Sequence, residues 1–137
     1  MIRVLTAARR TIRLAGYSFT SPTVVQGLLD AKRRGVDVKV LIDDKGNRSD
    51  ASRAAQRLIL QARIPLRRIS VYAIHHDKYV VVDGQTTETG SFNYSRAAAK
   101  SNSENVIVVW NNEKVARQYL AHWQNRWDKG VAITVAP

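Results

Sequence analysis

The run at residues 36–43, whose sequence is VDVKVLID, constrains the fold of this chain more than any other segment. Its apolar residues first alternate and then become continuous, which is typical of a strand buried in a sheet. A helix is predicted directly before it, because Ser21 can cap its first turn, Pro22 suits its first position and Gly35 ends it. A buried strand beside such a helix predicts a sheet that helices cover.

The rest of the chain adds strands and helices in an order that defines the fold class. Ile2, Leu5 and Ala8 have helical spacing, so the chain is expected to begin within a helix. The other expected strands are 11–19, 67–72, 76–83, 86–90 and 105–110, and the other expected helices are 51–62 and 113–129. This order predicts an α/β (α+β) fold, a mixed β-sheet sandwiched by helices. With 137 residues, 45% of them apolar, the chain 1–137 is expected to be one domain with its own core.

One side of the last predicted helix is aromatic. This side carries Tyr119, Leu120, Trp123 and Trp127. Their helical spacing predicts contact with the core or with a second subunit rather than a platform on which bases stack. His122 lies off this stripe and is interpreted as a surface residue.

The strongest functional signal is the pattern H-x-K-x4-D from His76 to Asp83, followed by G-S-x-N at residues 90–93. Side chains two apart on a strand share a face, so His76 and Lys78 should project together. The imidazole can attack phosphorus or move a proton, and the ammonium can hold a phosphate oxygen. Each part alone has an ordinary explanation, since His and Lys occur on solvated strand edges and Asp-Gly, Gly and Asn occur in turns. The complete pattern predicts a site for a phosphate group.

Basic charge is concentrated in the first half of the chain. The net charge is +11, and residues 1–70 contain 15 Lys and Arg against 5 Asp and Glu, whereas residues 71–137 contain 7 against 6. Such a field attracts a polyanion, with nucleic acid as the first candidate and an anionic membrane surface as the second. The chain has no Cys, which excludes disulfides and thiolate metal sites. No apolar run is long enough to span a bilayer, and no stable membrane association is expected.

The motif resembles the HKD motif of the phospholipase D superfamily, whose members cut phosphodiesters. Several stretches are similar to the small bacterial endonucleases of that superfamily, namely 15–20 (AGYSFT), 34–39 (RGVDVK), 76–83 (HDKYVVVD), 88–93 (ETGSFN), 102–105 (NSEN) and 122–127 (HWQNRW). The resemblance covers nearly the whole chain and implies a phospholipase D-like domain. The family's further N-terminal strand is missing from this sequence, and so is the signal peptide of its secreted members. The resemblance implies a periplasmic or secreted protein, and the missing signal peptide makes the cytoplasm the alternative.

The resemblance also implies a two-step mechanism that needs two histidines. One attacks phosphorus and forms a covalent phosphohistidine, while the other protonates the leaving oxygen and then activates water. His75 is expected to point to the opposite strand face from His76, so it cannot be the second catalyst. A two-fold homodimer, as the family's small members form, would bring His76 of both chains together.

The resemblance assigns roles to five residues of the motif and its surroundings. His76 is the expected nucleophile in one protomer and the general acid and base in the other. Lys78 and Asn93 are expected to bind the phosphate oxygens and stabilise the transition state, with Ser91 supporting the same cluster. Glu104 matches an acidic residue that accepts a hydrogen bond from the second ring nitrogen of the nucleophile, although an exposed Glu at a strand start is the ordinary alternative.

Three aspartates near these residues are given other roles. Asp83 occupies a hairpin turn and is expected to be structural. Asp43 and Asp44 follow a strand and could suggest a Mg²⁺ site. A covalent histidine with paired lysines supplies both the nucleophile and the neutralising charge, so a solvated loop is preferred and no metal or other cofactor is expected.

These observations predict a metal-independent, sequence-non-specific endonuclease that acts on DNA, with RNA as an alternative substrate. Six arginines of the basic half are candidates for a surface that contacts phosphates, namely Arg33, Arg34, Arg48, Arg53, Arg67 and Arg68. A phospholipase or cardiolipin-type phosphodiesterase on the same fold is an alternative, against which the basic charge argues. A catalytically silent nucleic-acid-binding module is another, but binding alone needs no positioned imidazole.

Overall fold

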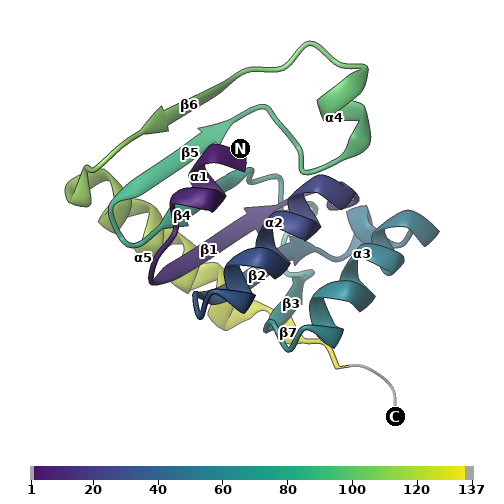
Figure 1. The fold of residues 1–137 in the computed structure, drawn as a ribbon. Helices are drawn as coiled ribbons and strands as arrows, with labels where there is room; N and C mark the ends of the chain where they lie inside the picture. The colour runs from purple at the N-terminus through teal and green to yellow at the C-terminus, as the bar shows by residue number, and fades with distance from the viewer. Residues whose placement is uncertain (1, 135–137) are drawn as a thin grey trace.

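A computed structural model describes residues 2–134 of the chain and places a mixed sheet at its centre. In this part of the chain seven strands pair in the order β6-β5-β4-β1-β2-β3-β7 (Figure 1). The strands are β1 (Thr11–Gly16), β2 (Asp37–Asp43), β3 (Leu66–Ile69), β4 (Tyr79–Val82), β5 (Thr86–Gly90), β6 (Val106–Val109) and β7 (Val131–Ala132). Because β1, β2 and β3 run parallel and all other neighbours antiparallel, the predicted mixed sheet is confirmed.

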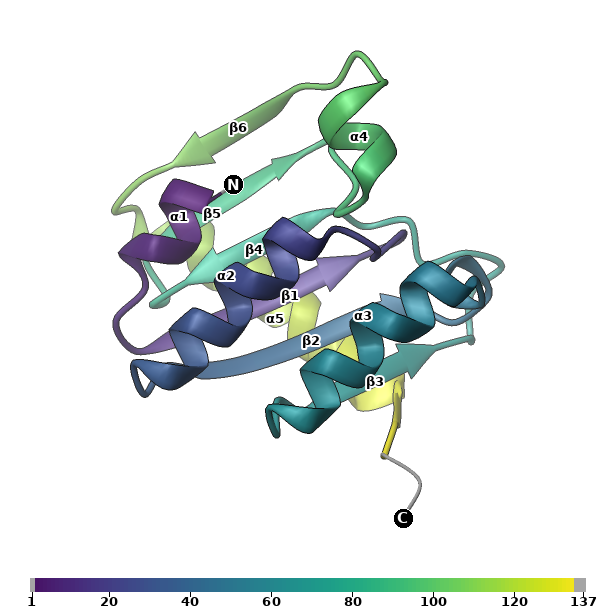
Figure 2. The same cartoon turned by 45° about the vertical axis from the view of Figure 1, so that its right-hand side comes forward.

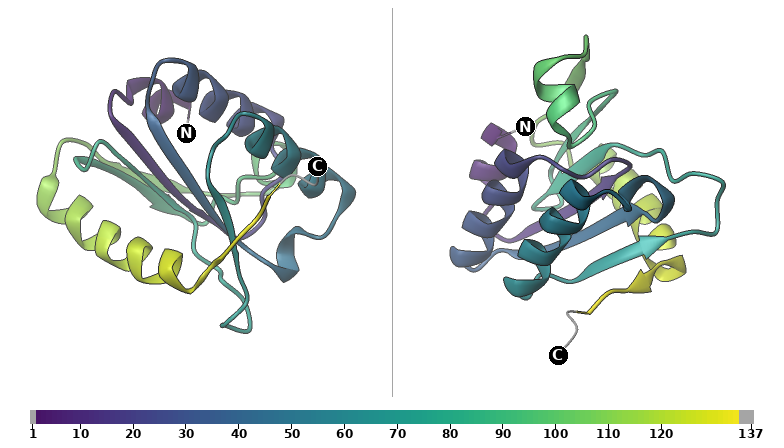
Figure 3. Two further views of the ribbon diagram at one scale, coloured as in Figure 1. Left: turned by 90° about the horizontal axis from the view of Figure 1, so that it is seen from below. Right: turned by 90° about the vertical axis from the view of Figure 1, so that its right-hand side faces the viewer.

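Helices cover both faces of this sheet, as the sequence predicts (Figure 2). The helices are α1 (Ile2–Ala7), α2 (Pro22–Arg33), α3 (Asp50–Gln61), α4 (Arg96–Lys100) and α5 (Glu113–Lys129), with a short 3-10 helix, η1 (Lys45–Asn47). The views in Figure 3 separate the two layers, with α1, α2 and α3 on one face and α5 on the other. The two parallel crossovers, through α2 and α3, place their helices on the same face.

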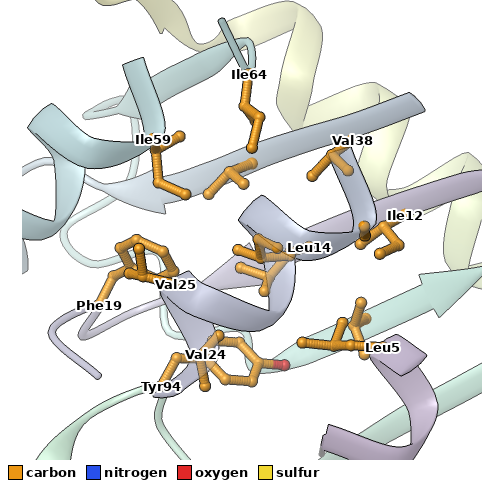
Figure 4. Packing of buried hydrophobic residues seen from close by; sticks show 14 of the residues in the cluster. Leu5, Ile12, Leu14, Phe19, Val24, Val25, Val38, Ile59, Ile64 and Tyr94 are labelled. Atoms are coloured by element: carbon orange, nitrogen blue, oxygen red, sulfur yellow. The ribbon is translucent and has the colours of Figure 1, made fainter. Parts of the chain in front are cut away.

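The larger hydrophobic core lies between the sheet and helices α1 to α3 (Figure 4). Ile12, Leu14 and Val38 point from the strands into this core. Val25 of α2 and Ile59 of α3 meet them from the helical layer. Alternate residues of each strand therefore serve this core, and the residues between them face α5.

The smaller core packs α5 against the opposite face of the sheet. Trp123 and Trp127 are buried against Ala15 and Leu41, and their rings stack with centroids 4.8 Å apart. The indole nitrogen of Trp123 donates a hydrogen bond to the carbonyl oxygen of Leu14 at 3.0 Å. The two tryptophans of the aromatic stripe are therefore core residues, one of the two roles that the sequence predicts for it.

The structure differs from the sequence prediction where β1 and β4 end. β1 stops at Gly16 rather than at residue 19, and Phe19 instead makes an isolated parallel bridge with Tyr94. β4 begins at Tyr79 rather than at residue 76, with Ala15 as the β1 partner of Tyr79. Because β1 ends at Gly16, which faces Lys78 in this register, the residues before Lys78 have no β1 neighbour with which to continue the ladder. The short elements α4 and β7 were not predicted.

Candidate active site beside the first residues of β4

Residues 74–78 lead into β4 and carry the histidine and lysine of the motif on irregular backbone. The predicted strand is wrong here, and the segment is tied to the end of β2 by a hydrogen bond of 2.7 Å from the His75 N–H to Asp43 Oδ1. The predicted alternation nevertheless holds, because His75 is 2% exposed whereas His76 is open to solvent. His76 is therefore the histidine that a substrate can reach.

Three side chains converge on the outer side of this segment. The imidazole of His76 meets the ring of Tyr17 edge-on, with centroids 5.0 Å apart and planes at 62°. Lys78 Nζ donates a hydrogen bond of 2.7 Å to the carbonyl oxygen of His76 and lies 5.8 Å from the centroid of the Tyr17 ring. Partial burial lowers the pKa of Lys78, against the opposing effect of Asp77 and Glu104. An exposed imidazole and a partly desolvated cation thus share one surface, the arrangement that binding and attack of a phosphate would require.

Tyr17 was not among the predicted site residues. It follows β1 directly, and its ring packs on Gly46, where an added Cβ would lie 2.8 Å from Tyr17 Cε1. The side-chain amide of Asn47 also donates a hydrogen bond to the Tyr17 carbonyl oxygen. Its position directly after β1 could have indicated a place at the site, because the loops that follow neighbouring parallel strands lie at the same edge of the sheet.

The G-S-x-N segment begins at the end of β5, where the glycine is required by close packing. A Cβ at Gly90 would collide with the backbone of Asn105 and Val106. Ser91 Oγ donates a hydrogen bond of 2.6 Å to Glu104 Oε1 and accepts one of 3.1 Å from the Asn105 N–H. Ser91 therefore fixes the position of Glu104 beside β5.

Glu104 has different partners from the one predicted. Asn102 Nδ2 donates to Glu104 Oε2 at 3.2 Å, in addition to the hydrogen bond from Ser91. These two bonds, and more weakly the charge of Lys78, lower the pKa of Glu104, so the carboxylate is ionised. Within residues 2–134 the predicted hydrogen bond between Glu104 and His76 is not formed, because the turn at residues 101–105 directs the carboxylate to Ser91.

Asn93 lies between β5 and α4 and has an unused side chain. Its Oδ1 is buried without a hydrogen-bond partner among the described residues. The next residue, Tyr94, accepts hydrogen bonds from the N–H groups of Thr20 and Ser21, so Asn93 is held close to the loop that follows β1. A phosphate oxygen would be bound by the Nδ2 donor of this amide rather than by Oδ1, and phosphate binding by Asn93 remains a prediction.

A pocket of about 460 Å³ lies between residues 76–79 and α5, and His76, Asp77 and Lys78 all line it. His122 was interpreted as a surface residue; its side chain is 37% exposed, and it also lines the same pocket as His76. His122 Nδ1 lies 2.8 Å from the hydroxyl of Tyr79 and 4.0 Å from Asp77 Oδ2. Asp77 Oδ2 in turn lies 3.0 Å from His75 Nε2. His122 is three residues from Tyr119, so helical spacing could have assigned it to the inward face.

The solvated-loop role expected of Asp43 is also wrong. Asp43 is 2% exposed, and its carboxylate accepts hydrogen bonds of 2.7 Å from the N–H groups of both His75 and Gly46. It is buried because these two backbone donors at the end of β2 need an acceptor. Asp44 is nearer the surface and pairs with Arg48 at 2.9 Å and Arg68 at 3.6 Å. Across residues 2–134, no group of three or more His, Cys, Asp or Glu side chains is arranged to hold a metal ion.

Asp83 lies at the other end of β4 from His76 and has φ +57°. Its Oδ1 accepts hydrogen bonds from the N–H groups of Arg10 at 2.7 Å and Thr11 at 2.9 Å, and its Oδ2 accepts one from Arg9 at 3.0 Å. The carboxylate thus joins the start of β1 to the turn after β4. These contacts are structural and use most of its acceptor capacity.

Two of the six candidate arginines are held by the fold itself. The Arg34 guanidinium donates to the carbonyl oxygens of Leu5 at 3.1 Å and Ala8 at 3.2 Å, which closes the end of α1. The Arg67 guanidinium lies 4.4 Å from the Trp127 ring centroid and donates to its carbonyl oxygen at 2.8 Å. Because these groups are already engaged, a surface that contacts phosphates is not expected to include them, contrary to the sequence prediction.

Of the remaining four arginines, Arg33, Arg48 and Arg53 are exposed and Arg68 is half-buried. Arg48 and Arg53 adjoin each other at the start of α3, where Arg53 Nε donates to the Arg48 carbonyl oxygen at 3.0 Å. The side chain of Arg48 is 60% exposed, whereas that of Arg68 is 34% exposed. Arg33 is also exposed but pairs with Asp30 near the end of α2. Arg48 follows η1, whose Gly46 is bonded to the same Asp43 carboxylate as His75, so its charge lies at the same edge of the sheet as the motif.

Comparisons with known proteins match nearly the whole chain to one family. Residues 1–127 match the family described as "Cardiolipin synthase, PLD-like domain". A "Phospholipase D" from Rickettsia bellii is 35% identical over 119 residues, which are 87% of this chain and 58% of that protein. A "Mitochondrial cardiolipin hydrolase" from Mus musculus is 30% identical over 129 residues, which are 94% of this chain and 57% of that protein. The chain therefore spans less than two thirds of the length of these relatives.

A solved structure matches the chain more completely. Nuc from Salmonella typhimurium, a phospholipase D family member, superposes with a TM-score of 0.97 and 46% sequence identity. The match covers 98% of this chain and 88% of that one. At this identity and coverage the two chains share their mixed sheet and its helical layers. Within residues 2–134, no helix is long and apolar enough to cross a membrane.

Proposed function

Since the chain belongs to the phospholipase D superfamily and is a phosphodiesterase of that superfamily, we propose that it is a metal-independent endonuclease without sequence preference. DNA is the proposed substrate, with RNA as the alternative. The observation that carries the proposal is the solvent-open imidazole of His76, with Lys78 Nζ held 2.7 Å from its carbonyl oxygen. The net charge of +11 supports a long polyanion as the substrate.

The proposed reaction has two displacements at phosphorus. A ring nitrogen of His76 forms a bond to phosphorus, the bond to the leaving oxygen breaks, and a second imidazole gives that oxygen a proton. The same second imidazole then takes a proton from water, whose oxygen displaces His76 and releases the other fragment. Lys78 and the Asn93 amide stabilise the charge on the phosphate oxygens in both steps. The ionised Glu104, held by Ser91, supports the positive charge of this cluster.

The second imidazole is proposed to be His76 of a second copy of the chain. His75 is excluded by its burial and by its contact with Asp77. A two-fold axis beside His76 would supply an identical histidine and a second lysine, so one composite site would form in a homodimer.

Mixing experiments test this arrangement. A tenfold excess of His76→Ala protein, allowed to exchange subunits with the wild type, should remove most of the activity, because mixed dimers contain a single His76. The same excess of an unrelated protein should have no effect. Light scattering that finds an active monomer at the assay concentration would contradict the composite site.

A phospholipase or cardiolipin-type phosphodiesterase is the second candidate function. The observation that favours it is the apolar edge of the sheet, where Val106 is 43%, Ile107 59% and Trp110 46% exposed. A lipid substrate would require such a surface beside the site. The basic first half of the chain favours nucleic acid over it.

One assay separates these functions. Purified protein in excess EDTA should be offered plasmid DNA, single-stranded DNA, RNA and cardiolipin vesicles, with His76→Ala as the control. The proposal expects nicking and degradation of DNA that the His76→Ala protein lacks, and no release of phospholipid headgroup products. If the protein hydrolysed cardiolipin and left DNA intact, the second candidate function would replace the first. If EDTA abolished the activity and Mg²⁺ restored it, the metal-independent mechanism would be overturned.

A further inference from the structure

The irregular backbone at residues 74–78 poses a problem for catalysis. His76 and Lys78 must be aimed accurately, because a small displacement of a reacting group costs a large factor in rate. β4 does not begin until Tyr79, so no strand ladder aligns the segment. The hydrogen bond from His75 to Asp43 fixes one end of it. Asp77, which lies between the two motif residues, needs its own support.

That support comes from two histidines on either side of the Asp77 carboxylate. Asp77 Oδ2 lies 3.0 Å from Nε2 of the buried His75 and 4.0 Å from Nδ1 of His122 on α5. Contact with His75 is the main cause that lowers the pKa of Asp77, against the opposing effect of burial, and the charges of His75, His122 and Arg126 contribute less. The Asp77 carboxylate is therefore in contact with His75 of its own segment and lies near His122 of α5.

Tyr79 fixes the orientation of His122. The Tyr79 hydroxyl lies 2.8 Å from His122 Nδ1, and the two rings meet edge-on with centroids 5.7 Å apart. Burial lowers the pKa of His122, and Arg126 and His75 lower it further against the opposing charge of Asp77. His122 Nδ1 thus lies between the Tyr79 hydroxyl and the Asp77 carboxylate, and a proton on Nδ1 can be donated to either.

We propose that His75, Asp77 and His122 are positioning residues that hold His76 and Lys78 in their reactive direction. The inference rests on the proposed function of His76 and extends it to the opposite side of the segment. Asp77 contacts the buried His75 while His76 is exposed, so fixing Asp77 restricts the backbone that carries both of its neighbours, His76 and Lys78. His122 is the decisive member, since it links the segment to α5, the one long helix on that face.

The test is the rate of the His122→Ala protein. We expect kcat to fall about 10- to 100-fold, the usual range for residues that orient a catalytic group, with KM changed less than threefold. His122→Gln, whose amide oxygen can accept from Tyr79, should recover part of the loss. Gln124→Ala is the matched control on the same helix, because Gln124 is exposed and bonded to Asp128, and it should behave as the wild type.

Two results would overturn the proposal. An unchanged kcat in a folded His122→Ala protein would remove His122 from the mechanism. A loss as large as that of His76→Ala, with no recovery in His122→Gln, would make His122 a catalytic residue instead. Measuring the same ratios on bis(4-nitrophenyl) phosphate separates this proposal from the choice of substrate, because positioning of His76 should matter for any diester even if nucleic acid is not cut.

Discussion

The two ends of β4 use polar side chains in opposite ways. After its last residue, the Asp83 carboxylate accepts hydrogen bonds from three successive backbone N–H groups at the start of β1. Before its first residue, His76 and Lys78 lie on irregular backbone and face solvent or the pocket. The motif H-x-K-x4-D therefore has a structural end, at Asp83, and a chemical end, at His76 and Lys78. A substitution at the structural end should lower stability, and one at the chemical end should lower the cleavage rate.

The largest effect is expected at the chemical end. His76→Ala should lower the cleavage rate by roughly 10⁴-fold or more, since a nucleophile is lost, and Lys78→Ala should be comparably severe. The His76→Ala protein should melt within a few degrees of the wild type and bind DNA almost as tightly, because His76 is exposed and most of the binding is expected from the basic surface. Activity assays, calorimetry and binding titrations check this, and a His76→Ala protein that cuts at near the wild-type rate would remove the mechanism.

The structural end should give the reverse result. Asp83→Ala leaves three backbone donors without their acceptor and should lower the free energy of unfolding by about 2–4 kcal/mol. The fraction that remains folded should cleave at close to the wild-type rate. Denaturant unfolding and activity per folded molecule check this, with Asp83→Asn, which keeps one acceptor oxygen, as an intermediate case. An Asp83→Ala protein of unchanged stability and lost activity would place Asp83 in the chemistry.

The arginines sharpen the same division between structure and function. Arg48→Ala removes an exposed charge near the motif and should lower the slope of log K for DNA binding against log[salt] by about one unit, equally for all sequences. Arg34→Ala should instead lower the melting temperature and leave the slope unchanged, because its guanidinium binds carbonyl oxygens at the end of α1. Equal slopes for wild type and Arg48→Ala would exclude Arg48 from the interface.

A smaller effect is expected in the dependence of stability on pH. The pKa of His122 is lowered in the folded chain, so below about pH 6.5 the unfolded chain takes up a proton that the folded chain resists. The stability contributed by neutral His122 is therefore present above that value and is lost as the pH falls through it. Melting temperatures between pH 7.5 and 5 should decline less steeply for His122→Ala than for the wild type. A steeper decline in the variant would contradict the lowered pKa.

The sequence predicts much of the fold because local patterns determine its long elements. The run VDVKVLID became β2, and Ser21, Pro22 and Gly35 delimit α2 as expected. The resemblance to the phospholipase D superfamily is confirmed over nearly the whole chain. Short elements such as α4 and β7 escaped prediction, since five residues and two residues carry too little periodicity to identify them.

The parts of the site that the sequence did not predict depend on contacts between distant segments. Asp43 is buried because two backbone donors, one of them 32 residues away, need its carboxylate. His122 lines the pocket because Tyr79, 43 residues earlier, offers it a hydroxyl. Local patterns cannot show the pairing that buries Asp43, and this is why its expected exposure was wrong. The burial of His75 predicts that His75→Ala lowers the stability of the fold.

Direct detection of the covalent intermediate tests the central claim, that His76 is the nucleophile. The protein should be mixed with a short oligonucleotide in excess EDTA, quenched within milliseconds in alkaline denaturant, and digested for mass spectrometry. The predicted result is a nucleotidyl adduct on His76. The adduct should be absent from the His76→Ala protein, and in the Gln124→Ala protein it should form in proportion to the cleavage rate of that protein. Rapid cleavage without an adduct at any time point, or cleavage that requires a divalent cation, would contradict it.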